Sequence, residues 1–316
     1  MKANGPVRVL GGAGTGKTVV LMHRANYLLK KIFTADTDRI LVTTFTKNLA
    51  LDLKANLKNL CGKDAERLDI IHLHGWASRF LKSQGHSFHA ITESQKKRMM
   101  KDSVNKGDTL DLDTAFYLEE WDHVVQANDV TDRDAYLTVR RVGRGTPLSR
   151  RQRAAVWEVF RIYREGLEEQ GKSEWADLIR EARLFSEKQG INLPYRAVLA
   201  DEVQDFSAGE LKLLRTIAPE GQDTMFLVGD GHQRIYGTPV TLGRCGIEIR
   251  GRSRRLKLNY RTTEQIGLRS IAILRGLEID DLDGGVDTLK GYSSLRSGPD
   301  PKTAHFESEA DEAKFV

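Results

Sequence analysis

The chain has 316 residues, of which 40% are hydrophobic and 29% are charged, and its basic and acidic side chains leave a net charge of +5. This length is typical of about two domains, and the composition allows a buried core in a soluble protein. The sequence has no apolar run near the ~18 residues of a membrane span and no signal-peptide pattern at its start, which favours a cytoplasmic protein. Cys61 and Cys245 are too few for a disulfide framework or a cysteine zinc site.

The first 84 residues alternate strand and helix signals. Val7 to Leu10 form an apolar run typical of a short buried strand, and the residues from Thr18 onward carry a broad apolar helical face. Residues 39–46 predict a second strand, which is followed by a helix from Asn48 to Leu60. This alternation favours a parallel sheet covered by helices.

Residues 91–189 show helix signals only. Within this segment Ser149 and Gln152 form a capping box at the start of one predicted helix. The apolar positions that follow share one helical face, which predicts a core rather than a base-stacking surface. These positions are Val156, Phe160, Tyr163 and Leu167.

Strand signals return at residues 195–202 and 224–230, so the helical segment is predicted to be an insertion in one nucleotide-binding sheet. A further strand-to-helix junction follows, and the chain closes with a predicted strand and a helix that Ser308 caps. The predicted domains are a sheet domain in two parts (1–88 and 191–255), a helical insertion domain (89–190) and the incomplete start of a second sheet domain (256–316).

Two basic segments are candidates for contact with nucleic acid. Residues 140–153 are rich in arginine and contain no acidic side chain, and residues 244–257 hold six cations against Glu248. Such clusters often neutralise phosphates, although solvated surface loops have the same composition. Four histidines have irregular spacing around a predicted helix, so we predict ordinary polar or packing roles for them and no zinc site. They are His72, His74, His86 and His89.

A glycine-rich loop joins the first predicted strand to the first predicted helix. Gly11 is followed after four residues by Gly16, Lys17 and Thr18, a spacing in which backbone N–H groups and the helix N-terminus surround a polyphosphate. Lys17 would reach the β- and γ-phosphates, and the Thr18 hydroxyl would be a ligand of Mg²⁺. The alternative is a flexible glycine turn that binds nothing. The residues inside the loop are Gly12, Ala13, Gly14 and Thr15.

Two acidic residues follow the apolar strand predicted at 195–202. The strand delivers Asp201 and Glu202 at its C-terminal end, where ligands bind in an open α/β sheet. Asp201 can hold the Mg²⁺ shell, and Glu202 can accept a proton from an attacking water. An ordinary acidic turn is the alternative. Together with the glycine loop, the pair predicts hydrolysis of ATP rather than its storage.

Six motifs in order resemble the superfamily 1 helicases of the UvrD/Rep type. They are "GGAGTGKT", "TTFTKN", "IHLHGWASRFL", "DEVQD", "VGDGHQRIYG" and "LNYRTTEQI", spread over about residues 7 to 269. The resemblance implies two RecA-like domains that bind ATP and Mg²⁺ between them, with helical insertions, and an α/β P-loop fold for this chain. It also implies that the chain moves on single-stranded DNA, with RNA as an alternative.

The resemblance carries over residue by residue. It implies the roles already given for Lys17, Thr18, Asp201 and Glu202. It further implies that Gln233 senses the γ-phosphate and couples it to the nucleic-acid groove, that Arg261 approaches the γ-phosphate as an arginine finger, and that Tyr260 stacks on the adenine. Without the resemblance these three would be a turn residue, a surface cation and a core aromatic, respectively.

The same resemblance implies a site for single-stranded nucleic acid. Phe45 lies just past a predicted strand and would stack on a base, whereas Thr44, Thr46 and His74 would contact the strand's backbone. Stacking is tolerant of sequence, as a motor that passes over every base requires. Considered alone, Phe45 is the kind of residue found more often in a core.

Three departures from the family pattern bear on function. Val19 stands where an arginine usually follows the Gly-Lys-Thr, and Thr238 stands where a tryptophan is expected, so the adenine contact and one stacking step are in doubt. The sequence also contains no adenine motif before the loop and no later motifs after Arg261. We therefore expect this chain alone to hydrolyse ATP slowly and to separate no duplex.

The sequence leads to an ATP-dependent nucleic-acid translocase or helicase of the UvrD type. One alternative is a module that grips single strands in response to nucleotide without processive movement. A P-loop ATPase that acts on protein partners is a third hypothesis, but it leaves Phe45, His74 and Gln233 unexplained. The oligomeric state is open.

Overall fold

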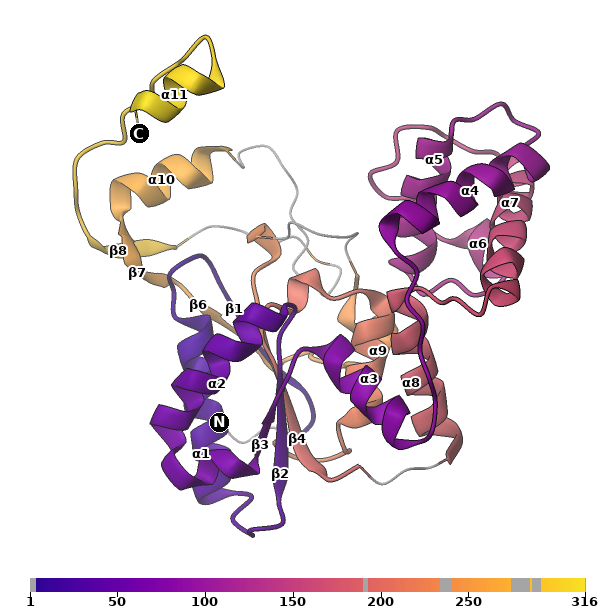
Figure 1. The fold of residues 1–316 in the computed structure, drawn as a ribbon. Helices are drawn as coiled ribbons and strands as arrows, with labels where there is room; N and C mark the ends of the chain where they lie inside the picture. Colours follow the sequence, from indigo (N-terminus) through magenta and orange to yellow (C-terminus); the bar gives the residue numbers. More distant parts are fainter. Residues whose placement is uncertain (1–3, 190–192, 234–239, 274–284, 286–290, 316) are drawn as a thin grey trace.

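The computed structural model describes residues 4–189, 193–233, 240–273, 285 and 291–315 (Figure 1). Its main feature is a parallel sheet of six strands in the order β3-β2-β4-β5-β1-β6. The apolar runs of the four inner strands, β2, β4, β5 and β1, are buried on both faces, as is typical of a parallel sheet, whereas the edge strands β3 and β6 are only partly buried. The predicted parallel α/β sheet is therefore confirmed. The strands are β1 (Val7–Gly11), β2 (Arg39–Thr43), β3 (Leu68–Ile70), β4 (Tyr195–Ala200), β5 (Met225–Gly229) and β6 (Ser253–Leu256).

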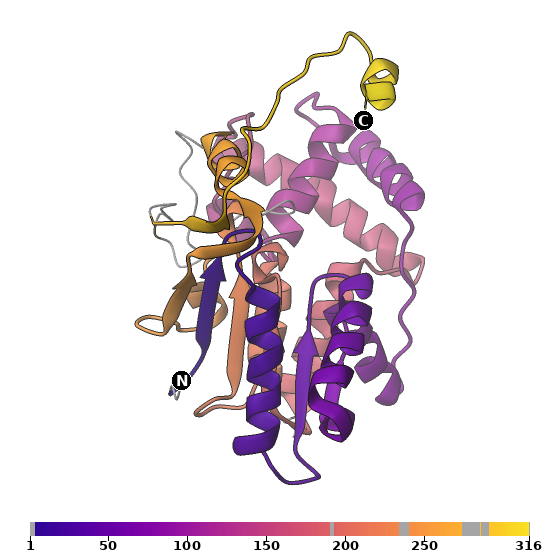
Figure 2. The ribbon, with the colours of Figure 1, turned by 90° about the vertical axis from the view of Figure 1, so that its left-hand side faces the viewer.

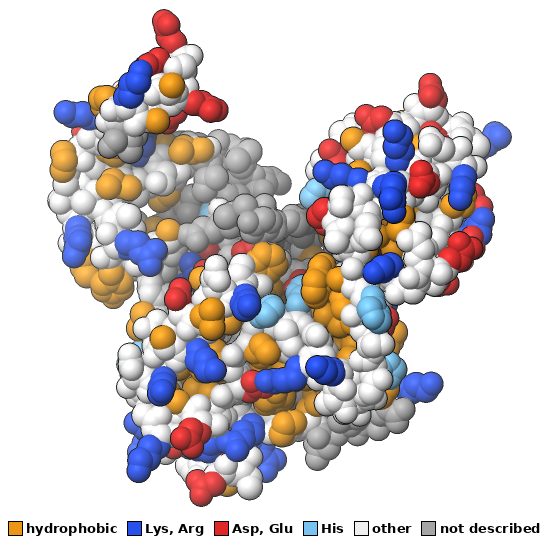
Figure 3. Space-filling model, in the orientation of Figure 1, with side chains coloured by type: hydrophobic (Ala, Val, Ile, Leu, Met, Phe, Trp, Pro, Cys, Tyr) orange, Lys and Arg blue, Asp and Glu red, His pale blue; other side chains and the backbone are white. Residues whose placement is uncertain are grey.

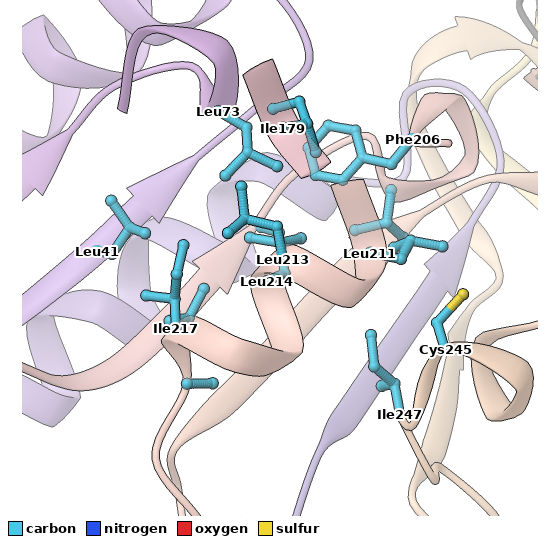
Figure 4. Packing of buried hydrophobic residues seen from close by; sticks show 14 of the residues in the cluster. Leu41, Leu73, Ile179, Phe206, Leu211, Leu213, Leu214, Ile217, Cys245 and Ile247 are labelled. Atoms are coloured by element: carbon cyan, nitrogen blue, oxygen red, sulfur yellow. The ribbon is translucent and has the colours of Figure 1, made fainter. Parts of the chain in front are cut away.

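Helices cover both faces of this sheet (Figure 1). On one face lie α1 (Lys17–Lys31) and α2 (Lys47–Cys61), and Figure 2 shows α1 running along the sheet in front of the strands. On the other face lie α3 (Leu73–Ser83), α8 (Trp175–Gln189) and α9 (Ala208–Ile217). Figure 4 shows residues of α9, such as Leu211, Leu214 and Ile217, in one buried cluster with Leu73 of α3 and Ile179 of α8.

A separate group of helices has a core of its own beside the sheet. Its elements are α4 (Glu93–Gly107), α5 (Thr114–Glu120), the π-helical turn η2 (Trp121–Gln126), α6 (Arg133–Thr138) and α7 (Arg150–Glu169). The capping box of Ser149 and Gln152 is confirmed, and the predicted apolar face of α7 is fully buried in this core. We call this group, residues 91–169, the helical unit.

Helix α8 packs with the sheet and not in the core of the helical unit. Its residues Leu178, Ile179 and Ala182 lie in the same buried cluster as Leu73 of α3 and Leu214 of α9. Helical periodicity predicts a buried face for such a helix, but it does not say which neighbour covers that face. The helix that precedes β4 thus connects the helical unit to the sheet.

Three arginines of the basic segment 140–153 are held by the helical unit itself. The guanidinium groups of Arg141 and Arg144 donate to the fully buried carboxylate of Glu120, with Arg141 Nη2 at 2.8 Å and Arg144 Nε at 3.0 Å. Arg153 donates to the carbonyl of Val139 at 2.8 Å. These side chains stabilise the loop before α7. Over the visible face of the unit, other basic side chains are interspersed with acidic ones (Figure 3).

A second, two-stranded parallel sheet follows β6. It consists of β7 (Leu258–Thr263) and β8 (Ser293–Arg296), with α10 (Glu264–Ile273) directly after β7. The terminal helix α11 (Glu309–Phe315) is capped as predicted, because Ser308 Oγ accepts from the N–H of Asp311 at 3.2 Å. The strand predicted just before this cap is wrong. Residues 301–306 pair with no strand in the described chain and are exposed, so no ladder holds them extended.

Short 3₁₀ helices lie in several of the connections between these elements. Among the described residues, no helix combines the length and the apolar character that a membrane crossing needs. The 3₁₀ turns are η1 (Gly62–Arg67), η3 (Val203–Asp205), η4 (Gly231–Gln233) and η5 (Leu242–Cys245).

Candidate functional site

The glycine loop connects the C-terminal end of β1 to the N-terminus of α1, as predicted. Gly14 and Gly16 have φ angles of 72° and 85°, which side-chain-bearing residues rarely adopt, and Gly16 is the N-cap of α1. The Thr15 hydroxyl donates to the carbonyl of Gly12 at 2.8 Å and closes the loop on itself. The free N–H groups of the first helical turn therefore open toward the mouth of the loop, where an anion would bind.

Lys17 folds back over this loop. Its Nζ donates to the carbonyl of Gly11 at 2.8 Å and to that of Gly12 at 3.3 Å. The same ammonium lies 3.8 Å from Oδ2 of Asp230, a buried oxygen that has no hydrogen-bond partner in the described part of the chain. A buried cation is thus placed at the position where phosphate oxygens would take over its hydrogen bonds.

Thr18 and Asp201 meet beside the lysine although 183 residues separate them. The Thr18 hydroxyl donates to Oδ2 of Asp201 at 2.8 Å. Asp201 is only 3% exposed, and burial, reinforced by the neighbouring charge of Glu202, raises the pKa of its carboxyl to about 6. A hydroxyl and a carboxylate are hard oxygen ligands, so this pair fits Mg²⁺ next to a polyphosphate.

Glu202 follows with a strained backbone. Its φ angle is 53°, in the left-handed region, and its N–H donates to Oδ1 of Asp201 at 3.0 Å. Such a conformation costs about 1–3 kcal/mol and persists where the surroundings impose it, often at functional sites. The strand predicted at 195–202 therefore ends at Ala200, because the chain turns sharply at Asp201 and Glu202.

The second sheet contacts the glycine loop. The N–H of Tyr260 donates to the carbonyl of Gly14 at 2.9 Å, and a Cβ added at Gly14 would lie 2.6 Å from Cβ of Arg261. Tyr260 and Arg261 are both exposed, and they line a cavity of about 740 Å³ together with Glu202 and the loop. The other lining residues are Ala13, Gly14, Thr15, Gly16, Lys17, Thr18, Val19, Val20 and Leu256.

The structure does not describe two of the side chains for which the sequence predicts or questions a role. Gln233 ends η4, directly after β5 and Asp230, but its side chain is not described. Thr238 lies outside the described residues altogether. The role assigned to Gln233 stays a prediction.

A second cavity of about 320 Å³ brings Phe45 and His74 together. The ring of Phe45 lies 6.2 Å from that of Phe206, and Nδ1 of His74 lies 3.5 Å from Oε1 of Glu210. The walls come from the turn after β2, from α3, from η2, and from the segment 205–210 that follows Glu202 in the chain. The cavity of about 740 Å³ at the glycine loop, called the nucleotide cavity below because a phosphate would bind there, is lined by Glu202. The two cavities are thus lined by one continuous stretch of chain, residues 202–210.

The two predicted threonines lie beside this cavity without lining it. Thr44 is 1% exposed, and its hydroxyl has no hydrogen-bond partner within the described residues. Thr46 is exposed, but its hydroxyl caps α2 by accepting from the N–H of Leu49 at 3.3 Å. The predicted strand at 39–46 consequently ends at Thr43.

Trp175 is a candidate residue that the sequence analysis missed. It is 53% exposed at the start of α8, its ring lies edge-on to His74 at 6.0 Å, and Phe88 lies 5.4 Å away on another side. Its helical spacing from Leu178 and Ala182 would assign it to the core, so periodicity gives no signal for its exposure. Only the folded chain places it beside His74.

Comparison of the sequence with known proteins identifies its family. The sequence model of a family described as "UvrD/REP helicase N-terminal domain" matches residues 1–238. A probable DNA helicase of Mycoplasma pneumoniae is 30% identical over 243 residues, which cover 74% of this chain and 45% of that protein. A probable DNA helicase II homolog of Mycoplasma capricolum is 26% identical over 83% of this chain and 38% of its own length.

A third relative extends over nearly the whole chain. DNA helicase II of Escherichia coli is 25% identical over 331 residues, which cover 98% of this chain and 43% of that protein. The chain therefore spans less than half the length of these curated relatives. Because the family match covers residues 1–238, most of the chain, the chain belongs to the UvrD/REP helicase family.

Proposed function

We propose that this chain hydrolyses ATP and couples hydrolysis to movement on single-stranded DNA, as part of a DNA helicase. The observation that carries the proposal is the segment 201–210. Asp201 accepts from Thr18, Glu202 lines the nucleotide cavity, and the segment ends in the cavity of Phe45 and His74. A motor needs such a connection, because strand binding must alter hydrolysis and hydrolysis must alter strand binding.

Each residue in or beside the nucleotide cavity has one role in this proposal. Lys17 and the loop N–H groups bind the β- and γ-phosphates. Thr18 and Asp201 would hold Mg²⁺, which would supply neutralisation of charge on the phosphate oxygens. Glu202 accepts the proton of the attacking water. Arg261 stabilises the charge that develops on the γ-phosphate, while Tyr260 packs against the base and Gln233 reports the state of the nucleotide.

The architecture supports a domain assignment along the same lines. The helical unit is inserted between α3 and α8 of a RecA-like sheet domain, and β7, β8 and α10 begin a second RecA-like domain. The contact of Tyr260 and Arg261 with the glycine loop supports this reading, since ATP would then lie between the two domains. Closure of that interface on ATP would drive translocation.

ATP turnover with and without single-stranded DNA tests the proposal. Strong stimulation by an oligo-dT strand supports the motor. Binding of the strand in the presence of nucleotide, without turnover, would instead show a nucleotide-gated binding module. Turnover that is indifferent to DNA would point to an ATPase that acts on protein partners. Oligo-U in place of oligo-dT shows whether RNA serves as well, and the names of the relatives favour DNA.

Phe45→Ala should weaken binding of single-stranded DNA by about 1–3 kcal/mol, because a base loses its aromatic stacking partner. Fluorescence anisotropy with a labelled oligo-dT strand measures this loss. Phe33→Ala is the matched control, since Phe33 is also partly buried but packs under the opposite face of the sheet. Trp175→Ala should weaken binding at a smaller cost in stability, because Trp175 is largely exposed. Equal DNA affinity of wild type and Phe45→Ala would assign Phe45 to the core.

Asp201→Asn should stabilise the protein without nucleotide while it abolishes Mg²⁺-dependent hydrolysis. Asp201 has a folded-state pKa of about 6 against 3.8 when unperturbed, so the folded state binds this proton more tightly than the unfolded state. Protonated Asp201 therefore stabilises the folded state fully below pH 3.8, the pKa of the unfolded state, and this stabilisation is lost as the pH rises through about 6. At neutral pH, ionised Asp201 therefore costs roughly 3 kcal/mol, which the amide avoids.

Thermal melts of wild type and Asp201→Asn in the absence of nucleotide check this expectation. The variant should melt several degrees higher near neutral pH, and the difference should shrink as the pH falls toward 4. The Mg²⁺ affinity of the wild type should fall over the same range, because the metal needs the ionised carboxylate. A variant that melts lower than wild type near neutral pH would show that Asp201 is not strained by burial.

A further inference from the structure

Gln204 is a buried polar side chain at the centre of the segment 201–210. It is 4% exposed and lies in η3, two residues after Glu202. Its Nε2 donates to Oε2 of Glu202 at 2.8 Å and to Oδ2 of Asp205 at 3.2 Å. Its Oε1 accepts from the N–H of Asp230 at 2.9 Å. One planar amide thus joins three separate parts of the site.

The three partners of this amide lie in different parts of the site. Glu202 faces the nucleotide cavity. Asp205 lines the second cavity, next to Phe206, whose ring neighbours that of Phe45. Asp230 follows β5, where it lies beside Lys17 and also accepts from the N–H of His232 at 3.0 Å. Because the amide is rigid and its polar atoms are all engaged, a shift of one partner displaces the others.

The surroundings leave this amide little freedom. A Cβ added at Gly229 would lie 2.8 Å from Oε1 of Gln204 and 2.8 Å from a methyl group of Val203, so the end of β5 closes directly over it. Glu202 itself sits in the left-handed backbone region and needs side-chain contacts to fix its carboxylate. The hydrogen bond from Gln204 supplies such a contact from a buried and fixed group.

We propose that Gln204 is a positioning residue that orients the Glu202 carboxylate toward the attacking water. This orientation depends on whether a base of the DNA strand occupies the cavity of Phe45 and His74. The inference rests on the proposed function, since it requires Glu202 to act as the base. When a base enters the second cavity and moves Asp205 or Phe206, the amide turns and carries the carboxylate with it. Gln204 would in this way connect strand binding to the rate of hydrolysis.

Two substitutions separate this role from a purely structural one. Gln204→Glu keeps the size and the acceptor for the Asp230 N–H but replaces the donor by an oxygen that faces two carboxylates. Gln204→Met keeps the volume and removes all three polar contacts without adding charge. ATP turnover with and without oligo-dT and the affinity for ATP are measured for both variants, on the full chain.

Both variants should hydrolyse ATP at least about tenfold more slowly than wild type, because misplacement of a catalytic group by 1 Å can cost ~10²-fold. Stimulation by oligo-dT should disappear in both, while ATP affinity stays within about threefold.

Val203→Ala is the control, because it loosens the same turn by removing buried methyl groups but leaves the amide contacts in place. It should lower the melting temperature and keep the stimulation by oligo-dT. If Gln204→Glu fails to fold, loss of stimulation in Gln204→Met decides the matter. Stimulation by oligo-dT equal to that of wild type in the folded Gln204 variants would overturn the inference and leave the proposed function standing. Absence of turnover in the wild type would overturn both.

Discussion

Lys17→Ala is expected to abolish ATP hydrolysis and to weaken ATP binding by at least about a hundredfold, as loss of a charged hydrogen-bonding group from a preorganised anion site implies. The side chain is buried and already fixed by the carbonyls of Gly11 and Gly12, so it loses little conformational entropy when it binds a phosphate. Without it, the anion would meet the Asp230 carboxylate with no cation in between. Isothermal titration with a non-hydrolysable ATP analogue and steady-state phosphate release measure the two effects.

Lys30→Ala is the matched control for this substitution. Lys30 lies in the last turn of the same helix, is exposed, and loses the same side chain. Its variant should bind and hydrolyse ATP as wild type does. Circular dichroism keeps a folding defect of Lys17→Ala apart from a binding defect, since Asp230 loses its neighbouring cation in that variant. Full turnover by folded Lys17→Ala would contradict the assignment of the loop as a phosphate site.

The elements that the sequence predicts well are those whose signals are local. The strand, glycine loop and helix at residues 7–31 follow one another along the chain, and the apolar runs of β4 and β5 are long enough to identify buried strands. The cap of α7 likewise depends on Ser149 and Gln152, three residues apart. In each case, neighbouring residues determine the conformation without help from distant parts of the chain.

The elements that the sequence misses depend on distant partners. Strand β3 has three residues, all only partly buried, and it exists because β2 offers a free edge. Strand β6 pairs with β1, about 245 residues earlier in the chain, which no periodicity can reveal. The same reasoning applies to α8, whose apolar face could equally have met the helical unit. Pairing over such distances is decided by the whole fold.

The candidate site divides in the same way. The phosphate loop is one continuous segment, and its spacing alone indicates its chemistry. The meeting of Thr18 with Asp201, and of the loop with Tyr260 and Arg261, is implied by the family resemblance and seen only in the folded chain. Gln204 stands in the motif "DEVQD", but the sequence does not indicate its role. No sequence pattern predicts that an amide in an acidic turn makes three hydrogen bonds at once.

Glu202→Gln is expected to leave ATP binding intact and to slow hydrolysis by about 10²-fold or more, the usual contribution of a general base. The amide has the size of the carboxylate and still offers an oxygen to the Gln204 N–H, so the strained turn keeps its hydrogen bonds. Only the ability to accept a proton from water is lost. Glu187→Gln on the exposed side of α8 is the control for the chemical change and should alter neither quantity.

The variant also distinguishes the motor from the nucleotide-gated module. In a motor, a protein that binds ATP but cannot hydrolyse it stays in the ATP-bound state, so its grip on oligo-dT in the presence of ATP should persist instead of cycling. In a module without turnover, wild type and Glu202→Gln would hold the strand equally long. Strand release is therefore timed by stopped-flow anisotropy for both proteins. An equal loss of ATP affinity and of hydrolysis in Glu202→Gln would show that this carboxylate builds the cavity, and the base would have to be sought elsewhere among its charged neighbours.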